Sequence, residues 1–343
     1  MGSYHSDISP GPSNRKLIMA TSGNYTLTIA RDDIIREAML NMGKLGEGES
    51  PSPQETNDMA LKLNMIVKQF QGKSDGAPGL KTWTRRRGFL FLHNTTGQYE
   101  VGPNATGWTT SFTKLTTTAP SVAGSNQITV ANTTGVSNND NIGIQITNGG
   151  GNGDIQWTTV QSFNPITGVI TLANNLTASV ATGARAYDYT TTGQNPLTIE
   201  AAVLRDDNNE DTPLWIMPSV QDYDILASKT DLDNISDPTQ IYYEWQLSNS
   251  FVYMDVAAAQ DVTKYMVLTY LEEIQTFVLP TDNPEYPVEW FLPLCWKLTK
   301  EACPMFNAPW TQLMQANYTE AMAIARKKQP ENCSLFFQSG GEE

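Results

Sequence analysis

The sequence contains few of the side chains on which catalytic and metal sites most often depend. Its 343 residues include two histidines, His5 and His93, and three cysteines. The cysteines form no C-x-x-C pair, so neither a zinc site nor a disulfide framework is indicated. No nucleophile can be matched to a histidine and a carboxylate as in a catalytic triad. We therefore expect a protein that is not an enzyme and has no catalytic residues, metal site or cofactor.

Two acidic stretches leave alternatives open. Residues 205–211 (RDDNNED) and 231–237 (DLDNISD) have the composition of calcium loops, but both lack the glycine that an EF-hand loop needs at its sixth position. We interpret them as solvated loops. A second alternative is an enzyme that cuts cell-wall polysaccharide with two carboxyl groups, but the acids are too numerous for one pair to be singled out.

Two of the cysteines belong to a long apolar segment, PVEWFLPLCWKLTKEACPMF at 287–306. On one helix, Cys295 and Cys303 would be separated by about 12 Å along the axis, which is too far for a disulfide. A free cysteine packs as a small apolar residue. We expect both thiols to be reduced and buried in a core.

Basic side chains and long apolar runs are also scarce. The sequence has 22 Lys and Arg against 36 Asp and Glu, a net charge of −14. Tight binding to DNA phosphates needs basic side chains, whereas an acidic wall suits a conduit through which DNA slides. No stretch approaches the roughly 20 apolar residues of a membrane span, and the N-terminus lacks the apolar region of a signal peptide. We expect a soluble protein without membrane contact.

Two helices are expected near the start. Residues 35–42 carry apolar side chains at helical spacing. Ser52, Pro53 and Glu55 form a helix-start signal, and the helix that follows has one apolar face and runs to about Phe70. The two helices are predicted to pack as an antiparallel hairpin.

Alternation of apolar and polar residues marks the strands. Residues 89–101 predict a β-hairpin with its turn at 94–97. Residues 105–190 are rich in Thr, Asn and Gly, carry little charge, and contain several alternating segments separated by turns. This composition predicts a small inserted all-β module, a sandwich or a barrel.

The second half mixes strands and helices. Further strands are expected at 197–203, 241–247, 251–256 and 265–273, and a short helix from about Ser219. Pro287 opens the long apolar helix, Pro293 kinks or restarts it, and a last helix covers about 310–328.

These elements predict an α+β fold in which a helical hairpin and C-terminal helices pack with β-hairpins, with the all-β module inserted. Five successive parts are expected: a flexible arm at 1–23, the helical hairpin and β-hairpin at 24–104, the module at 105–190, the rest of the core with the C-terminal helices at 191–330, and a tail at 331–343.

One basic cluster interrupts this acidic chain. Arg85, Arg86 and Arg87 are consecutive, at the point where the helical and β parts meet. They are either a solvated or acid-paired turn, or a contact to an acidic neighbouring subunit or to DNA phosphates.

The order of elements resembles a known family. Residues 32–70, DDIIREAMLNMGKLGEGESPSPQETNDMALKLNMIVKQF, resemble the opening of the head-to-tail adaptor proteins of short-tailed bacteriophages, also called packaged-DNA-stabilisation or tail tubular A proteins. There, a helix, a G-E loop and a second helix begun by proline and an acid precede a Y-x-(L/V)-G hairpin, which YEVG at 99–102 matches. The strand, short helix, hairpin and proline-acid entry to the C-terminal helix follow in order, so the resemblance covers 25–104 and 197 to about 325.

The match has departures. Phe70 stands where the family has tryptophan, DVAAAQ replaces a Pro-x-Pro after the second hairpin, and the module at 105–190 is larger than in the simplest members. The subfamily therefore stays open.

The resemblance implies a structural virion protein in the neck of a phage particle, assembled in the host cytoplasm. Its partners would be the portal protein, tail nozzle or tail spike and fibre proteins, further copies of itself in a ring of twelve, and double-stranded DNA passing without specific binding. The family's C-terminal helix reaches toward the portal, which implies a portal or subunit interface at Leu313, Met314, Met322, Ile324, Arg326, Lys327 and Lys328.

An alternative is a glycan- or receptor-binding tail component that uses the β module. Trp108, Trp157 and Tyr187 could stack on sugars, although such residues in small β modules more often belong to a core or an interface.

Overall fold

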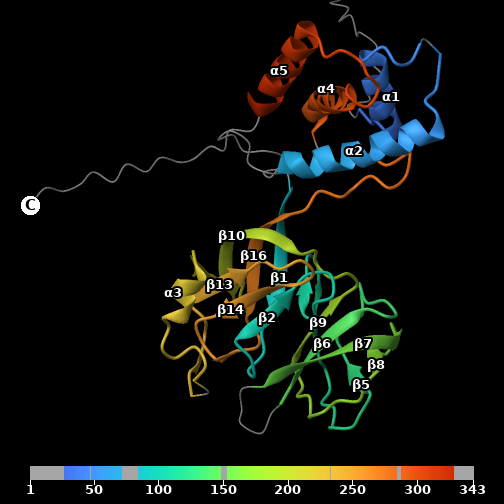
Figure 1. Ribbon diagram of the computed structural model, residues 1–343. Helices are drawn as coiled ribbons and strands as arrows, with labels where there is room; N and C mark the ends of the chain where they lie inside the picture. Colours follow the sequence, from blue (N-terminus) through green and yellow to red (C-terminus); the bar gives the residue numbers. More distant parts are fainter. Residues whose placement is uncertain are drawn as a thin grey trace, which may run out of the picture.

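The computed structural model describes residues 27–46, 48–71, 84–147, 153–231, 233–283 and 287–327. The predicted arm at 1–23 and tail at 331–343, with Lys328 and Cys333, lie outside these residues. Figure 1 shows a group of helices at one end of the molecule and two sheets at the other, joined by extended segments. Within the described part of the chain, no helix combines the length and the apolarity that crossing a membrane requires.

Four helices form the helical cluster: α1 (Arg31–Asn41), α2 (Pro53–Gln71), α4 (Phe291–Ala302) and α5 (Gln312–Lys327). The predicted start of α2 is confirmed, because the backbone N–H of Ser52 donates to Glu55 Oε2 (3.0 Å) and the N–H of Glu55 donates to Ser52 Oγ (3.3 Å). These two bonds satisfy donors that a helix start leaves unpaired.

The apolar faces of the four helices meet in one core. Met39, Leu63, Leu294 and Leu298 are completely buried there. Cys295 and Cys303 are buried and free, as predicted, and burial raises the pKa of the Cys295 thiol to about 12. The helices therefore bury their apolar faces chiefly against one another.

The long apolar segment differs from its prediction in detail. It begins with the 3-10 turn η2 (Val288–Trp290), and α4 then runs without interruption from Phe291. Pro293 neither kinks nor restarts this helix, because it lies in the first turn, where a backbone N–H has no partner within the helix.

An eight-stranded sheet has the order β2-β14-β13-β11-β10-β16-β1-β3. Its strands are β1 (Arg85–Phe91), β2 (Gln98–Val101), β3 (Trp108–Thr109), β10 (Pro196–Arg205), β11 (Asp211–Met217), β13 (Gln240–Glu244), β14 (Ser250–Met254) and β16 (Tyr265–Glu272). The two edge strands, β2 and β3, are separated by residues 102–107 alone, so the sheet must curl until its edges approach each other. The hairpin predicted around the SNS turn is confirmed as β13 paired with β14.

A six-stranded sheet, order β4-β9-β6-β7-β8-β5, forms the second β part. Its strands are β4 (Thr113–Thr116), β5 (Gln127–Thr129), β6 (Asn141–Ile146), β7 (Asp154–Asn164), β8 (Val169–Leu172) and β9 (Arg185–Tyr189). Smaller elements are α3 (Val220–Asp224) and a pair formed by β12 (Ile235–Ser236) and β15 (Ala258–Ala259).

The predicted hairpin at 89–101 is wrong, although both of its strands exist. Strand β1 pairs with β16 and β3, and strand β2 pairs with β14, so they lie far apart in the sheet order. Alternation shows that a segment is a strand, but it does not identify the partner.

The predicted fold class is also wrong. The chain is rich in sheet. Local hairpins such as β13–β14 are joined by pairings between strands far apart in the sequence, such as β1 with β16, into two large curled sheets that do not pack face to face with the helices. The helical core and the interior of the eight-stranded sheet are separate clusters. Helices and strands therefore stand beside each other as distinct bodies.

An aromatic contact joins the two sheets. Phe91 of β1 stacks on Tyr187 of β9 with 4.4 Å between ring centroids, and Phe112 meets Phe91 edge-on at 5.1 Å. Burying rings of this size contributes strongly to packing, and offset or edge geometries suit their quadrupoles. The module is thus docked on the larger sheet through apolar surface.

Candidate functional site

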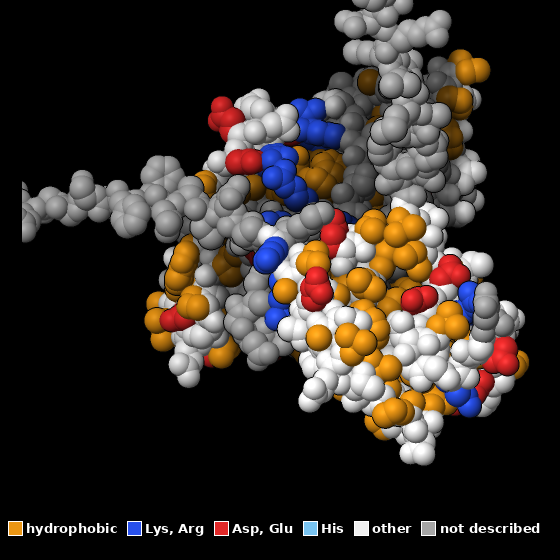
Figure 2. Space-filling view, turned by 90° about the horizontal axis from the view of Figure 1, so that it is seen from above, with side chains coloured by type: hydrophobic (Ala, Val, Ile, Leu, Met, Phe, Trp, Pro, Cys, Tyr) orange, Lys and Arg blue, Asp and Glu red, His pale blue; other side chains and the backbone are white. Residues whose placement is uncertain are grey.

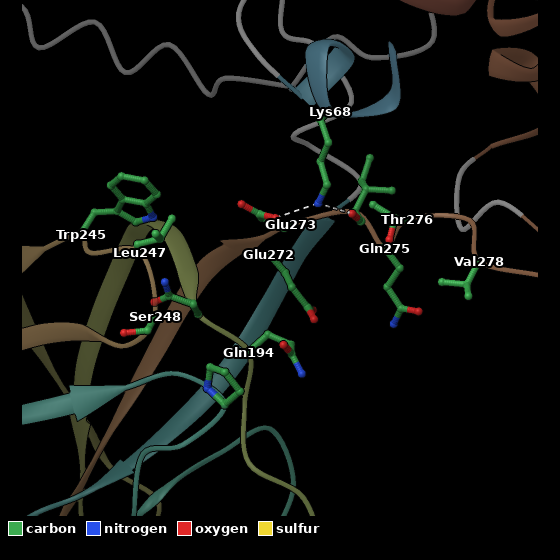
Figure 3. A pocket seen from close by; sticks show the side chains of 13 residues that line it. Lys68, Gln194, Trp245, Leu247, Ser248, Glu272, Glu273, Gln275, Thr276 and Val278 are labelled. Atoms are coloured by element: carbon green, nitrogen blue, oxygen red, sulfur yellow. Dashed lines mark hydrogen bonds and ion pairs between the residues drawn. The ribbon is translucent and has the colours of Figure 1, made fainter. Parts of the chain in front are cut away.

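An open groove of about 530 Å³ lies where the helical cluster meets the eight-stranded sheet (Figure 3). Lys68, near the end of α2, donates to Glu273 Oε2 (2.7 Å) and to the carbonyl oxygen of Ile274 (2.8 Å). One turn earlier, Asn64 exchanges two hydrogen bonds with the backbone of Phe277. These contacts hold the segment that leaves β16 along the side of α2.

The opposite wall of the groove comes from the loop after β13. Trp245 and Leu247 line this wall, and Val278 lines the helical side. Their exposed fractions are 53%, 91% and 73%. The lining that the structure describes includes Glu272 and Glu273 but no histidine or cysteine. The groove therefore offers apolar and charged surface for binding.

A group of tyrosines forms a second surface feature, on β13, β14 and α3. Tyr223, Tyr242 and Tyr253 are half-buried, with ring centroids 5.2 to 5.9 Å apart. Lys229 Nζ lies 4.3 Å from the Tyr223 ring, and the Tyr253 hydroxyl donates to Glu244 Oε2 at 2.8 Å. Tyrosine is enriched at the energetic centres of protein interfaces, so this cluster is a candidate contact surface.

The three predicted arginines lie on strand β1, not on a turn. Arg85 Nε is 2.6 Å from Glu200 Oε2, and Arg86 Nε is 3.4 Å from Glu272 Oε2. These acids belong to the neighbouring strands β10 and β16. Contact between Arg85, Arg86 or Arg87 and an acidic neighbouring subunit or DNA stays a prediction. For Arg85 and Arg86, such a contact would compete with the ion pairs to Glu200 and Glu272.

The predicted interface residues of α5 fall on different faces. Leu313 is 71% exposed and Ile324 is 50% exposed, whereas Met322 is buried in the helical core. Met314 and Arg326 are half-buried and Lys327 is exposed. Leu313 and Ile324 are therefore the apolar members of the predicted set that are free to meet another molecule.

The stretch at 205–211 forms the turn between β10 and β11. Arg205 pairs with Asp211 (2.7 Å), and Asp206 Oδ1 accepts the backbone N–H groups of Asn208 and Glu210. These acids stabilise the turn. Among the described residues, no group of three or more His, Cys, Asp and Glu side chains is placed to hold a metal ion.

The aromatic residues proposed for sugar stacking are largely inaccessible. Trp108 and Tyr187 are completely buried, and Trp157 is half-buried against the contact between the sheets. A glycan site would need other residues. On the face in Figure 2, several Lys and Arg side chains gather in the upper middle of the view, and Asp and Glu side chains lie in smaller groups among uncharged and apolar ones.

A histidine–carboxylate pair that was not predicted from the sequence links the two sheets. His93, in the turn after β1, places Nδ1 3.1 Å from Asp154 Oδ1 at the start of β7. The same oxygen accepts the backbone N–H groups of Asn94 (3.3 Å) and Ile155 (2.8 Å). Because the chain has few histidines, His93 could have been singled out from the sequence. Its partner could not, because Asp154 is 61 residues away along the chain.

Replacing Asp154 by Asn should weaken the attachment of the module. Burial alone would raise the pKa of Asp154, but hydrogen bonds from His93, Ile155 and Asn94 hold it below the usual value. A lowered folded-state pKa gives stability that is present above the unfolded-state pKa and is lost as pH falls through the folded-state pKa. We expect Asp154→Asn to cost about 1.5–3 kcal/mol at pH 7 and progressively less as pH falls through the folded-state pKa of Asp154, measured by urea unfolding over a pH series. A loss that stays constant down to the acid-unfolding limit would contradict this.

The sequence matches no protein-family model and no curated protein. The solved structures that share limited similarity with it include two phage tailspikes. The tailspike protein gp49 from Pseudomonas phage LKA1 is 18% identical, with a TM-score of 0.21 over 24% of this chain and 15% of that one. The gp54 tailspike of Acinetobacter baumannii bacteriophage AP22, solved with A. baumannii capsular saccharide, is 14% identical, with a TM-score of 0.22 over 25% of this chain and 16% of that one. The matched part thus spans less than a fifth of either tailspike, and at these TM-scores the likeness supports no argument about fold or activity.

Proposed function

We propose that this chain is a non-enzymatic structural protein of a phage virion, a head-to-tail adaptor that forms a ring under the portal and continues the DNA channel. One observation carries the proposal. The two segments that resemble the adaptor family, 25–104 and 197–325, are far apart in sequence, yet they share the helical core and the eight-stranded sheet. The six-stranded sheet between them in sequence is built from residues 113–189 alone.

The surfaces suit an assembly protein. The helical end exposes Leu313 and Ile324 on α5, which would contact the portal. The tyrosine cluster of Tyr223, Tyr242 and Tyr253 lies on the sheet body, where a tail nozzle, spike or fibre protein would bind. The net charge of −14 suits a wall past which DNA slides without being held.

The proposal is tested by the native mass of the purified chain, alone and after mixing with the portal ring of the same phage. We expect a stoichiometric ring complex with the portal. A chain that stays monomeric and ignores the portal would contradict the proposal. The glycan-binding alternative would then be favoured, provided that the full-length chain binds host surface polysaccharide saturably.

Charged substitutions on α5 should separate portal binding from folding. Leu313→Asp combined with Ile324→Asp is expected to weaken portal binding at least roughly ten-fold, because each removes an apolar contact at the proposed interface. Thermal stability should change little, since both side chains are exposed. Binding is measured by sedimentation with the portal ring.

The matched control is Ile166→Asp, which charges a side chain 92% exposed on the β module. It should bind the portal like the unaltered chain. Unchanged binding by the α5 double variant would show that α5 is not the portal-facing element.

A further inference from the structure

Two carboxyl groups face each other inside the six-stranded module. Asp188 lies on β9, and Asp140 directly precedes β6, where Asp188 pairs in register with Ile142. Both aspartates are 1% exposed. Tyr187 points toward the other sheet, so alternation directs Asp188, like Ala186, into the module interior. Residues 140 and 142 face the same side of the sheet, so Asp140 is the diagonal neighbour of Asp188 on that side.

The hydrogen bonds of this pair are incomplete. Asp140 Oδ2 accepts the backbone N–H of Ser137 at 2.6 Å. Among the described residues, Asp140 Oδ1 and both carboxyl oxygens of Asp188 meet no donor. A buried ionised carboxylate without donors is costly, and two adjacent ones also repel each other. One proton placed between the two groups removes both problems.

The basic side chains on the adjoining strands do not neutralise the negative charge of Asp140 and Asp188. Lys114 of β4 and Arg185 of β9 are both directed to Asp207, with Arg185 Nε 2.9 Å from its Oδ2. Thr113 of β4 and Ile142 of β6, the register partners of Asp188, are uncharged. Of the described titratable groups, Asp140 is the one that acts on Asp188.

We propose that Asp140 and Asp188 share a single proton in the folded module, and that loss of this proton as pH rises loosens the end of the module formed by residues 133–140. Burial and the charge of Asp140 raise the pKa of Asp188 to about 7, which agrees with the geometry. The inference concerns the module alone and does not depend on portal binding.

The direction of the pH dependence follows from linkage. Because the folded-state pKa lies above that of an unfolded Asp, the folded form holds a proton that the unfolded form has already released. Stability therefore falls as pH rises from about 4 to about 7 and is steady above that. Between pH 5 and pH 8, the equilibrium constant for closing the module should fall roughly a hundred-fold.

Hydrogen exchange of the full chain, followed by mass spectrometry, tests the proposal. We expect amides of β6, β9 and residues 133–140 to lose roughly a hundred-fold of protection between pH 5 and pH 8, after correction for intrinsic exchange. Asp188→Asn should keep high protection at both pH values, since an amide can donate to Asp140 permanently. If Asp188→Asn fails to fold, Asp140→Asn is the replacement variant, and it should also keep high protection at both pH values. Asp233→Asn, at an exposed position, should behave like the unaltered chain.

Two results would overturn the proposal. Protection of the unaltered module that does not change with pH would show that no proton is shared. If Asp188→Asn and Asp140→Asn lost as much protection between pH 5 and pH 8 as the unaltered chain, a group other than this pair would cause the pH dependence.

Discussion

Replacing Gly88 by Ala is expected to destabilise the eight-stranded sheet by about 3 kcal/mol, because a fully buried ring occupies the space that the new methyl group needs. A Cβ atom at Gly88 would lie 2.0 Å from Cη2 of Trp108. The ring cannot retreat easily, since a Cβ at Gly193 would lie 2.4 Å from its Nε1, and that nitrogen donates to the carbonyl oxygen of Gln194 at 3.1 Å.

Trp108 is therefore held between two glycines at the root of the module. Trp108 itself lies just before the first strand of the module, and Gly193 lies just after β9, the last one. The indole ring of Trp108 therefore packs against the chain that leaves the module and against Gly88 of β1 in the eight-stranded sheet. Its hydrogen-bonded Nε1 and complete burial make it part of the scaffold.

Equilibrium unfolding in urea measures the loss. The control is the double variant Gly88→Ala with Trp108→Leu, in which the smaller side chain leaves room for the methyl group. Its loss should be smaller than the sum of the two single losses, as expected for residues in direct contact. Additive losses, or a Gly88→Ala variant as stable as the unaltered chain, would contradict this account of the packing.

Replacing Trp290 by Ala is expected to cost about 3–5 kcal/mol in the helical cluster, the range for removing a large buried aromatic side chain. Trp290 is 2% exposed and meets the ring of Phe70 edge-on, with 5.6 Å between centroids. Its removal leaves a cavity between α2 and the start of α4.

The effect should be confined to the helices. We expect hydrogen exchange to increase in α1, α2, α4 and α5 while the two sheets keep their protection, because the helical core is separate from the sheet cores. Leu292→Ala, two residues away and 53% exposed, is the matched control and should have little effect. Equal losses for both variants would argue against a core role for Trp290.

Much of the local structure could be predicted from the sequence. The capping pair Ser52 and Glu55 placed the start of α2, and the SNS turn identified the β13–β14 hairpin, because both signals depend on residues within a few positions of each other. The burial of Cys295 and Cys303 followed from their place in an apolar helix.

Long-range pairing could not be predicted in the same way. Alternation marked β1 and β2 as strands but did not show that β16 and β14 are their partners. Strand β11 was missed because the preceding acids were interpreted as part of a loop, although they form the turn that leads into it.

The sequence by itself determined where most helices and strands begin, that the helices each have one apolar face, and that histidine and cysteine chemistry is sparse. Only the tertiary structure decided that Trp108 is enclosed by Gly88 and Gly193, that His93 meets Asp154, and that Asp140 faces Asp188. The physical reason is distance along the chain. Helical faces and turns are set by neighbouring residues, whereas a buried contact between remote residues depends on how completed sheets curl and pack.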